Sequence, residues 1–379
     1  MRKYPIIFFA AAAALAACTK TEVIPVENDT LAEITYETAP VTKAPTATQK
    51  EFKNTNIFSS VAFYLPESSS WDWADKTKPE VYIGSEDATI SGSYDGVTIA
   101  YDGKAWRNAA KKYYWPKKGK LTFFAWSLNS ANLNISFPST YGAGVYCIPS
   151  QGIVMNYFDI DDNKNIDFMV ADVALDKNTN QHEYYTDGVP TLFRHKLSQL
   201  YFTVREKEDY SGVKFTLNSI EFKNLADQAS YAQHPTESMS ALGINFSKSN
   251  QTYVTGSTQE VKYSTDGEAV QTNKNSQTIY LPQTFLKSNA GSQVVEITYT
   301  VEYTTDVDSD NDGKNDVITE TITETKKLCE LFPDSTSTGN GKWEMGKKYI
   351  LNLIFALDEI LWDPAVEDWT SVEQTVSIQ

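Results

Sequence analysis

The residues best spaced for chemistry form an acidic run near the carboxyl end of the chain. Asp308, Asp310, Asp312 and Asp316 fit positions 1, 3, 5 and 9 of a cation-binding loop, and Gly313 fits position 6. Calcium takes about six to eight oxygen ligands, and carboxylates at this spacing followed by glycine wrap a loop around one ion. The same residue types also form ordinary solvated turns. The sequence therefore predicts a turn that is either calcium-bound or simply solvated.

The acidic run differs from an EF-hand in its last ligand and in its flanks. Position 12 is Thr319 instead of a bidentate glutamate. Strand-like segments flank the run, one ending at Thr305 and the next beginning at Val317. A calcium-stapled hairpin is thus the metal interpretation. A second run with oxygen-bearing side chains, from Asp159 to Asp167, lacks the turn glycine and is interpreted as a loop.

Catalytic motifs find little support in the sequence. The histidines are His182, His195 and His234, and no two of them stand at the i and i+4 spacing of a helical metal pair. The sequence shows neither a recognisable nucleophile motif nor a glycine-rich phosphate loop. His195 lies in a strand-like block, which favours a packed, hydrogen-bonded histidine over a general base. We therefore expect a protein that is not an enzyme.

Two tryptophans supply an alternative function. Trp71 and Trp73 follow a serine run in a polar stretch, and exposed aromatic rings stack on the faces of sugars. This pattern would suit a surface lipoprotein that binds glycans. Tryptophans at i and i+2 lie on one face of a strand, however, so both are equally suited to a hydrophobic core.

Composition excludes two broad classes. The 379 residues include 49 acidic and 33 basic side chains, a formal charge of −16, which repels DNA and RNA. Hydrophobic residues make up 41% and aromatic residues 13% of the chain, too much for an intrinsically disordered protein. We expect a folded, β-rich protein that does not bind nucleic acid.

The amino terminus has the pattern of an export signal. Arg2 and Lys3 precede the apolar run 6–14, which is too short to span a bilayer, and small residues lead up to Cys18. The tetrapeptide 15–18 resembles the lipobox of bacterial lipoproteins, in which the cysteine is acylated after cleavage. This predicts a lipid anchor at Cys18; the alternative is an ordinary signal that leaves Cys18 unmodified.

The pattern of turns and strands predicts four segments. Residues 1–17 form the signal peptide, 18–50 a tether or removable leader, and 51–207 and 208–379 two domains. The boundary rests on the charged, glycine-containing interval 205–212 between two apolar runs.

Period-two alternation dominates after the tether. Apolar residues alternate with polar ones through 295–304, and 349–355 is apolar on both faces, as in a central strand. The fold class predicted is all-β, with two tandem antiparallel β-sandwiches. Cys147 and Cys329 each lie near an apolar strand, which favours two buried thiols over a disulfide.

Several blocks in a fixed order carry a resemblance. They are 113–116 (YYWP), Gly119, 121–126 (LTFFAW), 167–171 (DFMVA), 192–198 (LFRHKLS), 281–282 (LP) and 360–369 (ILWDPAVEDW). With the lipobox, this set resembles the fimbrillin family of Bacteroidetes, the lipoprotein subunits of type V pili.

The resemblance implies a fold, a location and partners. It implies two transthyretin-like, Greek-key β-sandwich domains, export as an outer-membrane lipoprotein, and assembly with other pilus subunits by strand exchange. Members serve as stalk, tip or anchor subunits, and an adhesin would also contact a receptor on a host or bacterial surface.

The resemblance also implies two segments that take part in assembly. In the family a trypsin-like protease removes an amino-terminal strand, often cutting after arginine, and the matching residue here is Lys43. A protease strictly specific for arginine would not cut there. In the segment 370–379, Val372, Gln374, Val376 and Ile378 alternate, as in a donor strand or in a terminal strand of the chain's own sheet.

Overall fold

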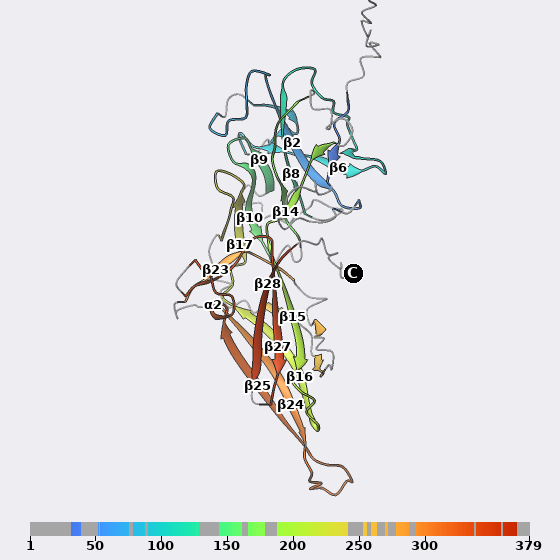
Figure 1. Ribbon diagram of the computed structural model, residues 1–379, viewed down its shortest axis with the longest axis vertical. Coiled ribbons are helices and arrows are strands. Elements are labelled where there is room, and N and C mark those ends of the chain that lie inside the picture. The colour runs from blue at the N-terminus through green and yellow to red at the C-terminus, as the bar shows by residue number, and fades with distance from the viewer. Residues whose placement is uncertain are drawn as a thin grey trace, which may run out of the picture.

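The computed structural model shows a chain built almost entirely of β-strands. It describes residues 32–38, 52, 54–75, 79–87, 90–128, 144–160, 166–178, 188–241, 253–255, 259–263, 270–271, 278–287, 293–336, 339–357 and 359–369. The strands form two lobes that follow each other along one long axis (Figure 1). Within these ranges the helix is α2 (Leu328–Leu331), and no helix is long and apolar enough to cross a membrane.

The first sheet of the upper lobe is the largest. In spatial order its strands are β13 (Val189–Pro190), β1 (Tyr36–Glu37), β7 (Trp106–Asn108), β6 (Val97–Tyr101), β2 (Phe58–Leu65), β8 (Lys120–Ser127), β11 (Met169–Ala171) and β14 (Phe193–His195), with β12 (Ala174–Lys177) beside β8 and β3 (Glu80–Ile83) beside β2. The first and last strands of this order, β13 and β14, are neighbours in sequence. The sheet therefore curls until its ends approach each other, and β1 lies near that seam.

The upper lobe has two cores because β2 and β8 are covered on both faces. Phe58, Ala62 and Phe123 belong to the core inside the curled sheet, while Val61 and Phe124 belong to the other core. The second core is shared with a sheet of β18 (Ser238–Ala241), β17 (Gln228–Ala232), β10 (Gly152–Asp159), β9 (Gly144–Ile148), β5 (Tyr94–Asp95) and β4 (Ser85–Glu86).

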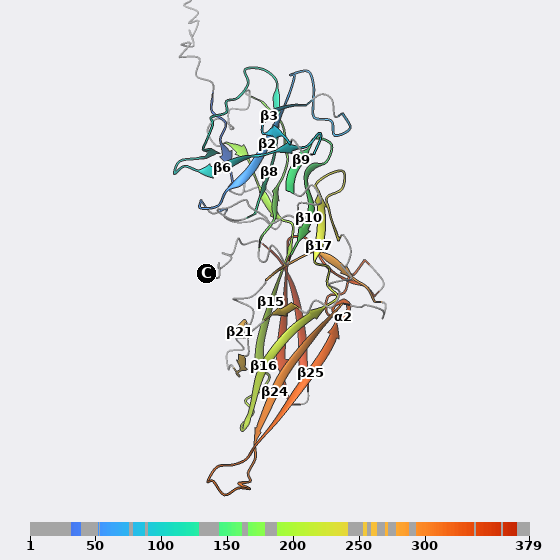
Figure 2. The same cartoon turned by 180° about the vertical axis from the view of Figure 1, so that it is seen from behind.

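The lower lobe consists of two facing sheets of long strands (Figure 2). One contains β21 (Val270–Gln271), β15 (Ser198–Glu206), β27 (Lys347–Phe355) and β28 (Ile360–Asp368), with β22 (Ile279–Tyr280) beside β15; the other contains β19 (Tyr253–Thr255), β16 (Val213–Lys223), β24 (Val294–Thr304) and β25 (Val317–Lys327), with β20 (Gln259–Val261) beside β16. Aromatic rings join the two sheets, with 5.6 Å between the Phe202 and Phe222 centroids and 5.1 Å between those of Tyr299 and Phe355.

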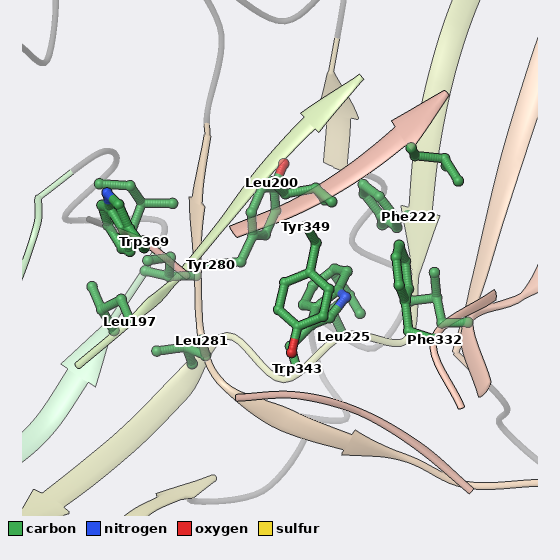
Figure 3. Close-up of a cluster of buried hydrophobic side chains, with 14 of the residues drawn as sticks. Leu197, Leu200, Phe222, Leu225, Tyr280, Leu281, Phe332, Trp343, Tyr349 and Trp369 are labelled. Atoms are coloured by element: carbon green, nitrogen blue, oxygen red, sulfur yellow. The ribbon is translucent and has the colours of Figure 1, made fainter. Parts of the chain in front are cut away.

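A dense aromatic cluster fills the upper end of the lower lobe (Figure 3). Trp343 lies on β26 (Gly341–Trp343), which pairs with β23 (Gln283–Phe285). Its ring packs against Phe285, Phe332 and Tyr349 with centroid distances of 4.9, 6.2 and 6.0 Å. This cluster continues the core of the lower lobe toward the junction with the upper one.

The all-β prediction is confirmed, and two details of the strands refine it. The predicted alternation of 295–304 and the central segment 349–355 are β24 and β27. Two pairs, β15 with β27 and β1 with β13, are parallel instead of antiparallel. Cys147 and Cys329 are buried free thiols, as predicted, and burial raises the pKa of the Cys147 thiol.

The structure differs from the predicted boundary at residue 207. Strand β15 pairs with β27 from Gln199 to Glu206, so it belongs to the lower lobe although it precedes the boundary. The charged turn that follows connects β15 to β16 within that lobe. The chain then returns to extend the upper lobe, because β17 pairs with β10. Polar turn residues indicate exposure, which connections inside a lobe share with linkers between domains.

Alternation along β24 generates a stability prediction. Ile297 is fully buried between the sheets, whereas Thr321 on the neighbouring β25 is exposed. Ile297→Ala is expected to lower the free energy of unfolding by about 2–5 kcal/mol, because it removes buried methyl groups and leaves a cavity. Thr321→Ala is the matched control, with an expected change within about 0.5 kcal/mol. Urea unfolding measures both, and equal effects would contradict the assigned faces of the hairpin.

Candidate functional site

The strand β1 comes from the predicted leader and is an inner strand of the first sheet. It lies inside the sheet, parallel to β13 on one side and antiparallel to β7 on the other. The Val189 amide donates to the Thr35 carbonyl and the Thr191 amide to the Glu37 carbonyl, both at 2.8 Å. Segment 32–38 therefore supplies partners to backbone groups on both sides that would otherwise be unpaired.

The other flank of this segment is held by the stretch after β7. The Ile34 amide donates to the Tyr113 carbonyl at 2.8 Å, and the Trp115 amide donates to the Ala32 carbonyl at 2.9 Å. The Glu33 carboxylate adds an ion pair with Arg107, whose Nη1 lies 3.1 Å from Glu33 Oε2. These contacts fix the register of the segment.

The side chains of β1 fill the core inside the curled sheet. Ile34 and Tyr36 are 3% and 4% exposed, whereas the residues between and beside them are half-buried, so one face of segment 32–38 is buried. The Tyr36 ring makes edge contacts with Phe58 and Phe123, with centroids 5.4 and 6.0 Å apart. Its hydroxyl donates to Ser60 Oγ at 3.0 Å. Burial raises the pKa of Tyr36, so the phenol stays protonated in the folded protein.

The chain is anchored again shortly after β1. Phe52 is buried, and its ring stacks on Phe193 with 4.8 Å between centroids. The predicted processing residue Lys43 thus lies between two anchored points, although Lys43 itself falls outside the described residues. The predicted lipidation residue Cys18 also falls outside them, as does the segment 370–379.

The acidic run forms the tip of the β24–β25 hairpin, at the lower end of the molecule (Figure 1). Carboxylate oxygens of Asp308, Asp310 and Asp316 lie within 4.8 Å of one another. Asn311 and Gly313 both have positive φ, +58° and +86°, which turns the chain sharply enough to bring the acids together.

Asp312, the fourth predicted ligand, is not part of this group. Its Oδ1 accepts a hydrogen bond from the Lys314 amide at 2.9 Å. Asp308 Oδ2 likewise accepts from the Gly313 amide at 2.9 Å, so local backbone hydrogen bonds already organise the turn. The structure brings together three of the four predicted carboxylates, and calcium binding there stays a prediction.

The second acidic run, from Asp159 to Asp167, is described only in part. Asp159 and Asp167 are buried, while residues 161–165 lie outside the described part of the chain. Asp159 Oδ2 accepts from Gln228 Nε2 at 3.0 Å. Both described acids thus have protein partners in the core, since Asp167 pairs with a histidine.

That histidine is His195, which is packed and hydrogen-bonded as the sequence predicts. Its Nδ1 lies 2.9 Å from Asp167 Oδ1, and the two side chains are each 2% exposed. The imidazole also stacks on Trp369, with 3.9 Å between ring centroids and 7° between the ring planes. A pair so enclosed cannot reach a dissolved substrate, and its position favours a structural joint between β14 of the upper lobe and the end of β28.

Trp71 and Trp73 are partly buried and pack against the core. The Trp71 ring lies 5.3 Å from that of Phe124, and the Trp73 ring is stacked on His234 at 4.0 Å. The Trp71 amide donates to the Asp176 carboxylate at 3.0 Å. The Trp71 and Trp73 rings meet edge to face, with 5.8 Å between centroids and 84° between planes, so they do not share one plane. Glycan binding at these residues stays a prediction.

Tyr36 and Ser60 are functional candidates that sequence reasoning missed. The segment 34–36 was the only β-like stretch in the predicted leader, which was the available signal. Its insertion into a sheet depends on strands about 70 and 150 residues later in the chain. Local pattern carries no information about such distant pairing.

Comparison with known proteins places this chain in a family. A family model described as fimbrillin-like matches residues 66–369. The chain therefore belongs to the fimbrillin-like family, which confirms the resemblance seen in the sequence. A comparison with curated proteins found no match.

Solved structures of fimbrial proteins are similar to this chain. A fimbrial protein from Bacteroides vulgatus is 15% identical, with a TM-score of 0.57 over 89% of this chain and 99% of that chain. A candidate cell adhesion protein from Bacteroides uniformis is 15% identical, with a TM-score of 0.46 over 90% and 99%. The tip fimbrial protein Mfa3 from Porphyromonas gingivalis is 10% identical, with a TM-score of 0.35 over 89% and 100%. The first of these likenesses supports the fold.

Geometry of the hairpin tip generates a prediction about calcium. Calorimetric titration of the protein is expected to show one site with a Kd of about 0.1–1 mM, the range of extracellular calcium modules. Asp310→Ala should abolish the heat, because it removes one of the three gathered carboxylates. Asp312→Ala should have a smaller effect, and Asp306→Ala is a matched control just outside the group. Absence of heat at millimolar calcium, or heat unaltered by Asp310→Ala, would refute the site.

Proposed function

We propose that this protein is a non-enzymatic subunit of a surface fimbrium that assembles by strand exchange at the position of β1. The observation that carries this proposal is the insertion of segment 32–38 between β13 and β7. The segment lies upstream of Lys43, so one cut there would separate it covalently from the rest of the fold. Membership of the fimbrillin-like family supports the same function.

Removal of β1 would leave a groove between β13 and β7 that another strand could enter. The facing edges of β13 and β7 would present unpaired backbone groups, and the sites of Ile34 and Tyr36 would become empty apolar pockets. A strand that adds to such an edge gains backbone hydrogen bonds, and alternate side chains fill the pockets. The partner in this proposal is another fimbrial subunit.

The proposal also includes export and anchoring. The amino-terminal pattern ending at Cys18 supports a lipoprotein of the outer membrane, held by acyl chains that each contribute about 0.8 kcal/mol per buried CH₂. An anchor subunit would keep this lipid and β1, whereas a stalk subunit would lose both on processing. A tip or anchor subunit that acts as an adhesin would in addition contact a receptor on a host or bacterial surface.

Strand exchange can be tested with one substitution and an arginine-specific protease. The chain contains four arginines, Arg2, Arg107, Arg194 and Arg205, the last three of which lie in strands. Lys43→Arg therefore gives such a protease a cut site directly after the leader strand. When a fimbrial subunit with a free donor strand is added, cleaved Lys43→Arg protein is expected to form complexes that survive on gels without heating, because the opened groove accepts that strand.

The unsubstituted protein treated in the same way is the matched control, and it should stay monomeric. Mass spectrometry verifies that the cut lies at residue 43 and that the leader has dissociated. If cleaved protein that has lost the leader neither forms oligomers nor takes up any added strand, the proposed mode of assembly is refuted.

Anchoring is tested separately by metabolic labelling with a palmitate analogue. The protein produced in a bacterium that acylates lipoproteins is expected to carry the label, and Cys18→Ala should lose it while Cys147→Ala keeps it. Cys147 is a suitable control because it is buried in the folded upper lobe. Unlabelled protein, or label that persists in Cys18→Ala, would rule out the lipid anchor.

A further inference from the structure

The pocket of Tyr36 selects the strand that can replace β1. We propose that this groove accepts a strand from a different subunit in which an aliphatic residue is followed two positions later by tyrosine. This inference rests on the proposed strand exchange and adds to it the identity of the incoming side chains. The inference is drawn from the lining of the pocket, in which Phe58 and Phe123 contact the Tyr36 ring and Ser60 accepts its hydroxyl.

The pocket demands a planar ring. Edge contacts from Phe58 and Phe123 surround the Tyr36 ring, and both phenylalanines are fixed in central strands. Such pairs contribute about 0.5–1.5 kcal/mol beyond the area that they bury. An aliphatic side chain at this position would leave part of the pocket empty, and protein interiors collapse only partially around such voids.

The pocket also demands a hydroxyl donor. Ser60 is fully buried, and its own hydroxyl donates to the Phe124 carbonyl at 3.2 Å. Because that proton is already used, Ser60 Oγ meets the occupant as an acceptor, and Tyr36 supplies the donor at 3.0 Å. Phenylalanine would fill the space but leave this buried acceptor with one bond fewer.

The groove is shaped for the backbone of the occupant as well. Gly188, directly before β13, has φ of +89°, and a Cβ there would lie 2.8 Å from the carbonyl carbon of Tyr36. Any other residue would push against the inserted strand. The position two residues before the tyrosine is filled by Ile34, which points into the same core.

Segment 370–379 does not meet the requirement. Segment 370–379 contains Val372, Val376 and Ile378 at alternate positions but no aromatic residue. It could offer aliphatic side chains to the groove but neither a ring nor a phenolic donor. We therefore do not expect segment 370–379 to replace β1.

Competition between peptides tests this selection. Lys43→Arg protein, cut after residue 43, is incubated with a fluorescent peptide of residues 30–40, and unlabelled peptides compete for the groove in an anisotropy measurement. Changing Tyr36 to Phe in the competitor should weaken binding by about three- to tenfold, the value of one buried hydrogen bond. Changing Tyr36 to Val should weaken it by more than about thirtyfold, and a peptide of residues 370–379 should be as weak as that.

Substitution of Ser60 tests the contribution of the tyrosine hydroxyl apart from that of the ring. In Ser60→Ala protein the preference for tyrosine should be lost, and the phenylalanine peptide should bind at least as tightly, because the buried phenolic hydroxyl then has no acceptor. Ser60→Thr should keep the preference for tyrosine. Thermal unfolding before cleavage verifies that both variants fold.

The outcomes distinguish this inference from the function on which it rests. If no peptide binds the opened protein, including the one with its own sequence, strand exchange at β1 is refuted. If peptides carrying Tyr, Phe and Val bind alike, the groove accepts strands without selection, and only the present inference is overturned.

Discussion

The structure depends on one constraint: every backbone amide and carbonyl inside a sheet needs a partner. In the upper lobe the segment 32–38 meets that need for both β13 and β7. Its side chains also complete a core in which Phe52, Phe58, Trp106 and Phe193 surround the seam of the curled sheet. The amino-terminal segment is thus a structural member of the lobe.

Sequence alone predicted the parts of this fold that depend on local pattern. Strand β24 alternates because one face is buried against β27, and five alternating apolar residues made that visible. The placement of β1 was not predictable, because the short β-like stretch 34–36 says nothing about partners far along the chain. The boundary near residue 207 was misplaced for a related reason, since a charged turn looks the same whether it joins two domains or two sheets of one lobe.

The candidate sites differ in what the sequence could reveal about them. At the hairpin tip the ligand types and spacing are local, so three of the four acids were identified correctly as a group. Asp312 is outside that group, and its carboxylate instead accepts a hydrogen bond from the Lys314 amide. The Tyr36 pocket has no local signature, since Phe58, Ser60 and Phe123 come from two other strands. Ser60 acts as an acceptor in this pocket because its own hydroxyl already donates to the Phe124 carbonyl.

The arrangement of the lower lobe has a mechanical consequence. Strands β15, β27 and β28 run along the long axis of the molecule (Figure 1), and β28 pairs with β27 through nine consecutive residue pairs. Tension along that axis would load these hydrogen bonds in parallel, as shear, instead of opening them one after another. The stack of Trp369 on His195 closes the end of β28 nearest the upper lobe. A chain pulled from its carboxyl end would first have to withdraw this tryptophan from the core before the ladder carried the load.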